Sequence, residues 1–250
     1  MRPPTVFSIA GSDPGGGAGV QADLKTFLDH DVFGMAAVTA ITVQDSARVY
    51  RVCPVDPALV GEQVRAVLAD YPVDAIKIGM LGTVAIAEEI ARALTTYRGP
   101  VVLDPVLAST GGVPLVEGLA AVRLLLPLTT LATPNYGEAV ALGLIRGTGG
   151  ADPHPAVLVK GGHVVSDIAF VIDVLYDGIR VIRFRHRRQP HAPHGTGCTL
   201  SSAIASRLAR GDGLDIACRG AIRYVSRLIA RPGIGLGAGH PPLLHGVRPR

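Results

Sequence analysis

Residues 5–30 read TVFSIAGSDPGGGAGVQADLKTFLDH and place a strand, a glycine-rich loop and a helix in direct succession. The first six residues are mostly apolar and β-branched or aromatic, so they predict a strand. Helical spacing of apolar residues begins after the glycines and predicts a helix over residues 18–30. A strand joined to a helix is the repeating unit of parallel-sheet proteins, and this stretch therefore predicts an α/β fold.

The rest of the chain repeats this alternation. It predicts a largely parallel central sheet with helices on both faces. Residues 168–186 differ, because two β-type runs flank Asp177-Gly178, and they predict an antiparallel hairpin at one edge of the sheet. No linker, repeat or low-complexity segment interrupts the sequence, so we expect residues 1–250 to form one domain. The further predicted strands cover residues 35–43, 75–79, 100–104, 130–134 and 156–161, and a second predicted helix covers residues 57–71.

The composition limits the functional classes. Of the 250 residues, 48% are hydrophobic and 18% are charged, which is typical of a folded globular protein. The net charge is +4, and the only dense basic segment is RFRHRR at residues 183–188, so we expect no nucleic-acid partner. No apolar stretch reaches the roughly 18 residues of a membrane span, and the first residues lack the apolar run of a signal peptide. We therefore expect a cytoplasmic protein without a membrane partner.

The three cysteines lie far apart and form no CxxC pair. This pattern argues against a disulfide framework or a zinc site and indicates a reducing compartment. Cys53 and Cys218 are predicted to be small buried residues. Cys198 follows Gly195-Thr196-Gly197 at the predicted start of a helix, where free N–H groups can bind an anion and the helix dipole lowers the pKa of a thiol. Cys198 could be a nucleophile, a metal ligand, a base beside a phosphate or a core residue.

Glycines, acids and a lysine gather where the predicted strands end, the edge at which open parallel sheets bind ligands. The glycines of residues 11–19 allow close approach to a ligand, although no Gly-Lys-Ser/Thr completes a Walker A loop. Asp104 and Glu138 offer oxygen ligands suited to Mg²⁺. Lys160, one of three lysines, follows an apolar run where it can meet phosphate charge. Together with Gly195–Cys198, these residues suit phosphoryl transfer.

Several of these residues also have a purely structural interpretation. Asp104 could simply end a strand, and Glu138 and Asp23 could complement the dipole of a helix. We expect His163 and His194 to be structural or exposed to solvent. The joint placement of the acids at strand ends is what favours a site.

Motifs along nearly the whole chain resemble the hydroxymethylpyrimidine/phosphomethylpyrimidine kinases of thiamine biosynthesis, within the ribokinase-like superfamily. The matching stretches are SIAGSDPGGGAGVQADLKTF (8–27), VDAIKIGML (73–81), VVLDPV (101–106), TPN (133–135), VLVKGGH (157–163), VLYDG (174–178), HGTGCTLSSAIA (194–205) and GLGAGHPPLLH (235–245). The stretches at 8–27 and 194–205 are highly specific. The resemblance implies a ribokinase-like three-layer sandwich.

The resemblance also implies an ATP- and Mg²⁺-dependent transferase that is a homodimer. Such an enzyme phosphorylates the hydroxymethyl group of a pyrimidine and then phosphorylates the monophosphate to the diphosphate. By matching position, the small-molecule pyrimidine would contact Gly11, Asp23, Gln44 and Met80. Asp23 and Gln44 offer the donors and acceptors that an aminopyrimidine edge requires.

The same resemblance implies the residues on the nucleotide side. Lys160 would contact the ATP phosphates, and Asn135 with Glu138 matches the NxxE magnesium motif of the superfamily. Glu138 and Asp104 would bind Mg²⁺. Asn135, Thr196 and Gly197 would join Lys160 around the nucleotide. Gly195, Thr196, Gly197 and Cys198 would surround the transferring phosphoryl group, with Cys198 as the base or the group that positions the acceptor.

The chain departs from the family pattern at three places. Only twelve residues, IRGTGGADPHPA, separate Leu144 from Val157, and their glycines and prolines exclude the helix that is usual there. Ala192-Pro193 replaces the usual Asn-Thr, and Asp45 replaces the usual Asn. A pyridoxal kinase on the same scaffold is the main alternative, although residues 107–115, LASTGGVPL, lack the second cysteine of that group. A cysteine hydrolase and a non-catalytic pyrimidine-binding descendant are further alternatives.

Overall fold

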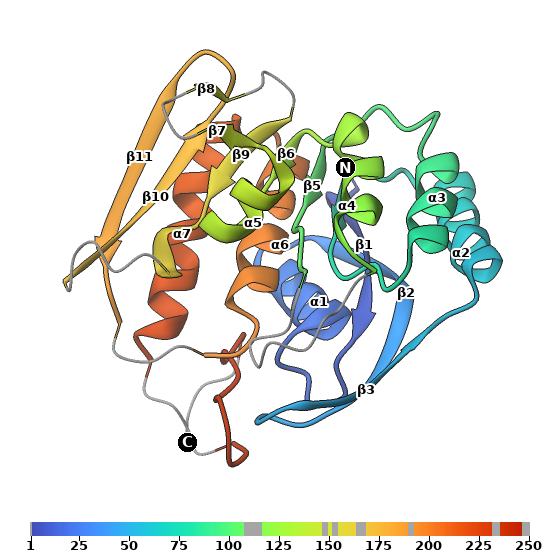
Figure 1. The fold of residues 1–250 in the computed structure, drawn as a ribbon, viewed down its shortest axis with the longest axis horizontal. Helices are drawn as coiled ribbons and strands as arrows, with labels where there is room; N and C mark the ends of the chain where they lie inside the picture. Colours follow the sequence, from blue (N-terminus) through green and yellow to red (C-terminus); the bar gives the residue numbers. More distant parts are fainter. Residues whose placement is uncertain are drawn as a thin grey trace.

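A nine-stranded sheet runs through the computed structural model of the protein, in the order β11-β10-β9-β6-β5-β4-β1-β2-β3 (Figure 1). The structure describes residues 2–107, 117–146, 150–151, 155–163, 169–189, 193–231 and 236–246. The sheet strands are β1 (Thr5–Ser12), β2 (Phe33–Gln44), β3 (Val49–Pro54), β4 (Ala75–Ile78), β5 (Val101–Leu103), β6 (Leu131–Ala132), β9 (Ala156–Val159), β10 (Phe170–Tyr176) and β11 (Val181–Arg187). The six strands from β9 to β2 in that order pair in parallel, as the sequence predicts.

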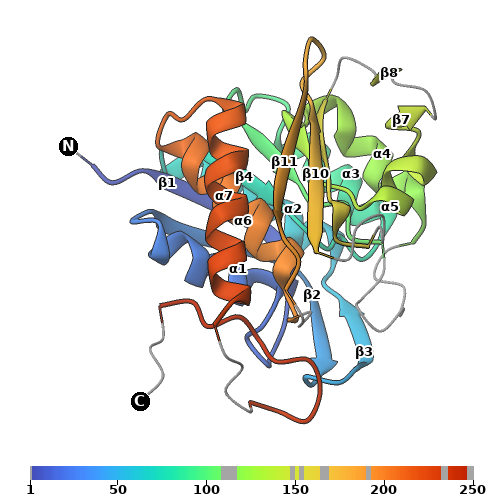
Figure 2. The same cartoon turned by 90° about the vertical axis from the view of Figure 1, so that its left-hand side faces the viewer.

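The helices cover both faces of the sheet, which confirms the predicted three-layer sandwich. They are α1 (Gly19–Asp29), α2 (Pro57–Asp70), α3 (Val84–Ala93), α4 (Leu119–Leu125), α5 (Tyr136–Leu142), α6 (Thr196–Ala209) and α7 (Leu214–Ile229). Figure 2 shows α1, α6 and α7 on one side of the sheet and α3, α4 and α5 on the other.

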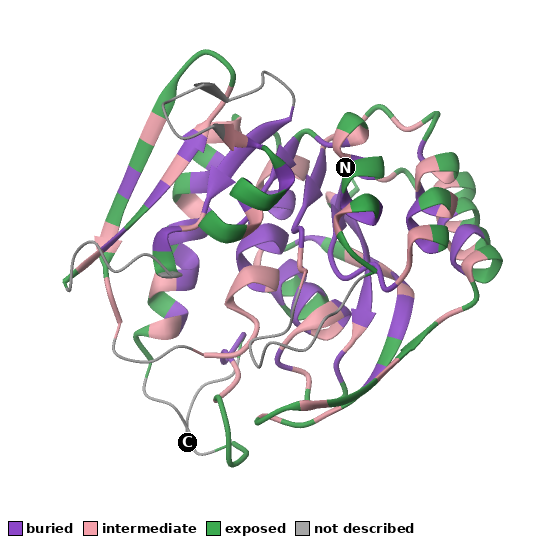
Figure 3. Ribbon diagram, viewed as in Figure 1, coloured by how far each residue is buried: buried purple, intermediate pink, exposed green. Residues whose placement is uncertain are grey.

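Alternate residues of each buried strand supply the two hydrophobic cores. Phe7 of β1 packs in the core shared with α2 and α3, whereas Val6 packs in the core shared with α1, α6 and α7. This is the period-two pattern of a strand that is buried on both faces. Figure 3 shows the resulting buried centre, with exposed residues on the outer sides of the helices and at the sheet edges.

Both edges of the sheet are antiparallel, and the sequence predicts only one of them. The hairpin of β10 and β11 lies at the predicted edge, and its turn is held by Asp177, whose Oδ1 accepts hydrogen bonds from the N–H groups of Ile179 and Arg180. The other edge is β3, which pairs with β2 and has no counterpart in the sequence-based prediction. Cys53 lies on β3 and is exposed, so its predicted burial is wrong, whereas Cys218 is buried as predicted.

The short segment after α5 contains no described helix. Two short strands, β7 (Ile145–Arg146) and β8 (Gly150–Ala151), pair there in a separate small sheet. The structure does not describe residues 108–116, which include most of LASTGGVPL. It also does not describe Ala192 or the side chain of His163. Within the part that is described, no helix has both the length and the apolar character needed to cross a membrane.

Candidate active site at the carboxyl ends of the strands

The parallel strands bring the predicted site residues to one edge of the sheet. Gln44 ends β2, and Met80 follows β4 by two residues. Asp104 follows β5 directly, and Lys160 follows β9. Asn135 forms a parallel bridge with Lys160 and so continues the pairing of β6 and β9. The chain therefore places residues from five strands around the start of helix α6.

Helix α6 begins beside an ion pair. Its N-cap is Gly195, at a φ of 81°, and no side chain caps the helix. Within the described residues, no group accepts a hydrogen bond from the N–H of Thr196, Gly197 or Cys198. A Cβ atom at Gly197 would lie 3.3 Å from Oδ2 of Asp104 and 3.4 Å from Nζ of Lys160. The helix start and Lys160 thus converge on one small space, which suits an anion.

The ion pair leaves one oxygen of Asp104 unused. Nζ of Lys160 lies 2.9 Å from Oδ1 of Asp104, and Oγ1 of Thr133 lies 3.3 Å from the same oxygen. Oδ2 of Asp104 is buried and has no hydrogen-bond partner among the described residues. Burial acts to lower the pKa of Lys160, but Asp104 and Glu138 outweigh burial and raise it. A buried carboxylate oxygen without a partner is a site for a cation.

Glu138 is the second acid that could hold Mg²⁺. It forms a capping box with Asn135: Oε2 of Glu138 accepts from the N–H of Asn135 at 2.7 Å, and Oδ1 of Asn135 accepts from the N–H of Glu138 at 2.9 Å. Burial raises the pKa of Glu138, an effect that a nearby cation would reverse. Mg²⁺ commonly binds one or two carboxylates and completes its shell with phosphates and water. Asp104 and Glu138 fit that requirement.

Cys198 is half-buried at the third position of α6. Burial raises the pKa of its thiol to about 11, although the charge of Lys77 and a hydrogen bond from the Gly19 N–H act to lower it. The expected lowering by the helix dipole is therefore wrong, because burial outweighs it. Across the described chain no histidine pairs with Cys198, since His194 pairs with Asp13. This arrangement does not match a cysteine hydrolase.

Asp23 lies below the site with no exposed surface. Its two oxygens accept hydrogen bonds from Lys77 Nζ at 2.8 and 2.9 Å, from Ser8 Oγ at 2.6 Å and from Ser202 Oγ at 2.7 Å. Contact between Asp23 and a substrate does not fit this structure, because the carboxylate is saturated and covered. In the sequence, the signal that Asp23 is a buried ion-pair partner is Lys77, a lysine inside the apolar strand AIKI. A lysine buried in this way needs an acid beside it.

Gly11 and Met80 lie against each other, and Gln44 lies beside His194 in the segment that precedes α6. A Cβ atom at Gly11 would lie 2.8 Å from Sδ of Met80, so the missing side chain at Gly11 makes room for Met80. Nε2 of Gln44 lies 3.5 Å from Nε2 of His194. His194 contacts Gln44 and Asp13, which is the structural one of the two roles expected for it.

Asp13 organises the glycine-rich loop beside His194, and it is not among the predicted site residues. Its Oδ1 accepts from the N–H of Gly15 at 2.8 Å, and its Oδ2 accepts from those of Gly17 at 3.0 Å and Ala18 at 2.8 Å. Oδ2 also lies 3.3 Å from Nε2 of His194. The signal in the sequence is Asp-Pro-Gly-Gly, which is typical of a turn that an Asp side chain closes.

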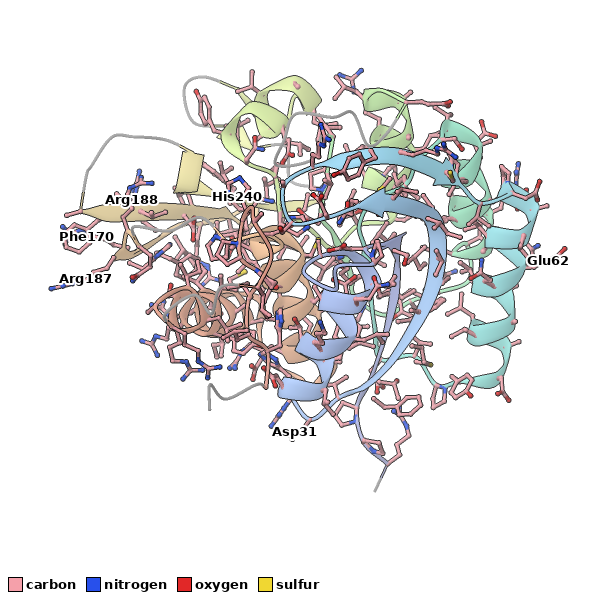
Figure 4. All side chains as sticks on the ribbon, turned by 90° about the horizontal axis from the view of Figure 1, so that it is seen from below. Asp31, Glu62, Phe170, Arg187, Arg188 and His240 are labelled. Atoms are coloured by element: carbon pink, nitrogen blue, oxygen red, sulfur yellow. The ribbon has the colours of Figure 1, made fainter. Side chains whose placement is uncertain are left out.

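The C-terminal tail, residues 236–246, packs against the same loops. The N–H of His194 donates to the carbonyl of Pro241 at 3.0 Å, and the N–H of His240 donates to that of Ser46 at 2.9 Å. Figure 4 labels His240 on this tail beside the turn between β2 and β3. The tail therefore joins the β2–β3 turn to the segment that precedes α6.

Comparison with known proteins places this chain in one family. The model of the family described as phosphomethylpyrimidine kinase matches residues 13–244. A hydroxymethylpyrimidine/phosphomethylpyrimidine kinase of Streptomyces coelicolor is 40% identical over 98% of this chain and 96% of its own. The thiamine biosynthesis bifunctional protein ThiED of Geobacter sulfurreducens is 40% identical over 96% of this chain, which spans 52% of that protein.

A solved structure shows the same fold. The ADP complex of Bacillus subtilis pyridoxal kinase is similar with a TM-score of 0.85 and 33% identity, over 98% of each chain. These similarities agree with the family and the ribokinase-like fold expected from the sequence motifs.

Proposed function

The chain belongs to the phosphomethylpyrimidine kinase family, and from this membership we propose that it uses ATP to phosphorylate 4-amino-5-hydroxymethyl-2-methylpyrimidine and then the resulting monophosphate. Both transfers serve thiamine biosynthesis. One observation supports this function most: the uncapped start of α6 faces Lys160 and Asp104 across a space that Gly197 leaves open. Backbone donors and a fixed cation around one small space suit a phosphoryl group in transfer.

The nucleotide would lie on the side of Lys160. Lys160 would contact its phosphates as a fixed positive charge, and the N–H groups of Thr196 and Gly197 would donate to the phosphoryl oxygens. Asp104 and Glu138 would hold Mg²⁺. When bound, Mg²⁺ would neutralise charge on the phosphates. The side chain of Asn135 is used to cap α5, so its proposed effect on the nucleotide is indirect, through the position of Glu138.

The acceptor would lie on the opposite side, against Gln44, Met80 and Gly11. Asp23 would act from below, since its hydrogen bond with Ser202 fixes α6 one turn after Cys198. Cys198 would lie between acceptor and phosphoryl group. A thiol with a pKa of about 11 keeps its proton at neutral pH, so among the roles left open by the sequence we propose the positioning of the acceptor hydroxyl.

We also propose that residues 1–250 act as one domain and that the protein is a homodimer. Strands from both halves of the chain share one sheet, which supports a single domain. The outer face of β2 and β3 presents Ile41 and Val43, which are 57% and 50% exposed, and a second copy would cover them. Sedimentation equilibrium of the wild type and of Ile41→Asp tests this, and a monomeric wild type contradicts it. Cytoplasmic location and the absence of a nucleic-acid partner stay predictions.

A pyridoxal kinase is the second candidate function, because a solved pyridoxal kinase shares the fold over 98% of this chain. A phosphotransfer assay with the hydroxymethylpyrimidine and pyridoxal side by side separates the two. We expect a higher kcat/KM for the pyrimidine and formation of its diphosphate. A pyridoxal kcat/KM equal to or above that of the pyrimidine would contradict the proposed function.

A further inference from the structure

Asp173 of strand β10 contacts the segment of chain that carries Lys160. Its Oδ1 accepts a hydrogen bond from the N–H of Gly161, the residue directly after Lys160, at 2.8 Å, and this contact is buried. Its Oδ2 lies 3.0 Å from Nε2 of His186 on the neighbouring strand β11. The edge hairpin therefore places a buried carboxylate against the backbone beside the lysine that we assign to the nucleotide.

The backbone on both sides of Lys160 is held by hydrogen bonds. The antiparallel pairing of β9 with β10 stops before Lys160, and the N–H of Lys160 donates to the carbonyl of Pro134 at 2.8 Å. The next N–H along the chain, that of Gly161, goes to the carboxylate of Asp173. Because a peptide group is planar, these two hydrogen bonds fix the peptide planes before and after Lys160. They thereby set the direction in which its side chain leaves the backbone.

Close packing keeps this segment against the hairpin. A Cβ atom at Gly161 would collide with the carbonyl oxygen of Ile172, the residue before Asp173, so only glycine lets the chain approach β10 here. The carbonyl of Gly162 accepts a hydrogen bond from Arg188, which directly follows β11, at 2.9 Å. The end of the hairpin thus contacts both glycines that follow Lys160.

His186 holds the second oxygen of Asp173. Its other ring nitrogen, Nδ1, lies 3.5 Å from Oγ of Ser226 on α7. A neutral imidazole that donates from Nε2 accepts at Nδ1, and a serine hydroxyl can supply that hydrogen. Oδ2 of Asp173 is therefore anchored toward α7, which leaves Oδ1 for the N–H of Gly161.

We propose that Asp173 is a positioning residue for nucleotide binding: through the N–H of Gly161 it fixes the direction in which Lys160 presents its charge to the ATP phosphates. A charge that is held in place before the ligand arrives loses little conformational freedom on binding. The inference rests on the proposed function, in which Lys160 contacts those phosphates. It gives the edge hairpin a part in nucleotide binding.

The test is a double-mutant cycle on nucleotide affinity in the full chain. Calorimetry measures the Kd of a non-hydrolysable ATP analogue, with Mg²⁺, for the wild type, Asp173→Val, Lys160→Ala and the double variant. We expect Lys160→Ala to raise the Kd about 10- to 100-fold, as the loss of a hydrogen bond from a charged group does, and Asp173→Val to raise it about tenfold. In the Lys160→Ala background, Asp173→Val should change the Kd less than about twofold, because Asp173 acts through Lys160.

Steady-state kinetics give a second measurement. Asp173→Val should raise the KM of ATP and leave the KM of the pyrimidine unaltered. Asp173→Asn should recover most of the ATP affinity, because its amide oxygen can still accept from Gly161 and its NH₂ group can donate to His186. Asp177→Val is the matched control: Asp177 accepts two backbone N–H groups at the turn of the same hairpin, away from the Lys160 segment. We expect this control to keep the wild-type Kd.

Asp173→Val combined with His186→Phe decides the matter if Asp173→Val alone does not fold, because removing both partners leaves no imidazole donor unmet. This variant should show the same rise in the Kd of the ATP analogue. Wild-type affinity in the variants that lack Asp173, or a tenfold rise that persists in the Lys160→Ala background, would overturn the positioning role while the kinase function stands. A Lys160→Ala protein with wild-type affinity for the analogue would overturn the proposed nucleotide side and this inference together.

Discussion

The chemistry available to Cys198 depends on its surroundings more than on its position in the helix. A thiol at a helix start usually has a lowered pKa, and the sequence led us to expect that. The structure instead half-buries the side chain, and this burial raises the pKa of the thiol to about 11. At pH 7 a group with that pKa is deprotonated in about one molecule in 10⁴. The side chain therefore suits hydrogen bonding to the acceptor more than proton removal.

Comparing the two phosphotransfer steps distinguishes whether Cys198 acts as a base or as a positioning group. In the first step a neutral alcohol must lose a proton, whereas the acceptor of the second step is a phosphate monoester that is mostly dianionic at pH 7. A general base would accelerate mainly the first step, typically by about 10²–10⁴-fold. Because the thiol is protonated, we expect Cys198→Ala to slow both steps by similar factors.

The measurement is the ratio of the two rates, with saturating ATP and Mg²⁺, in the wild type, Cys198→Ala and Cys198→Ser. Serine retains a donor at the position and should recover part of the rate of both steps. A ratio that falls about a hundredfold in Cys198→Ala would show that the thiol is a base after all.

At the scale of elements, four segments are joined beneath the site by one buried ion pair. Asp23 of α1 binds Lys77 of β4, Ser8 of β1 and Ser202 of α6. Neither Asp23 nor Lys77 has an exposed side-chain surface. Ser202 lies one helical turn after Cys198, so this cluster holds the face of α6 that carries the site.

Asp23→Ala should leave the charge of Lys77 buried without its partner and lower the free energy of unfolding by about 3–5 kcal/mol. Replacing both partners, as in Asp23→Leu with Lys77→Met, should recover most of this loss, because no unpaired charge then remains. Urea unfolding at neutral pH measures both. Glu62→Ala is the control: Glu62 is exposed on α2, where Figure 4 labels it, and its effect should stay within about 0.5 kcal/mol. A double variant no more stable than Asp23→Ala would contradict the explanation.

For the whole molecule, the strands that are buried could be predicted from the sequence, whereas the exposed edge strand β3 could not. Strands β1, β4, β5 and β9 are buried on both faces, so their apolar runs are visible in the sequence. Strand β3 (VYRVCP) has no buried residue, so no face of it belongs to the core. Its position follows from the β2–β3 turn held by Asp45, a local hydrogen-bond pattern that hydrophobic periodicity does not detect.

Prediction of the candidate site from the sequence meets a similar limit. Parallel topology alone brings Gln44, Asp104 and Lys160 to one edge, so their grouping could be predicted from the strand order. The roles of Asp23 and Asp13 could not be separated from the sequence, because both are acids in one strand–loop–helix unit. Which of them faces Lys77 and which faces the loop depends on side-chain direction, and this is fixed only by packing across distant segments.

Acid stability is a property of the whole molecule to which Asp13 should contribute measurably. Its pKa falls from the model-compound value of 3.8 to about 2 in the folded protein. A carboxyl group with a lowered pKa stabilises the fold above its unfolded pKa, and this contribution is lost as pH falls toward the folded value. For Asp13 the contribution is about 2 kcal/mol, lost between about pH 5 and pH 2.

The midpoint of urea unfolding should therefore fall between pH 5 and pH 3 in the wild type, and Asp13→Asn should reduce the size of that fall, since an amide does not titrate in this range. Asp70→Asn, an exposed residue at the end of α2, serves as the control for removal of one negative charge and should keep the wild-type fall. If Asp13→Asn loses as much stability as the wild type over this range, the loop contacts do not hold Asp13 ionised.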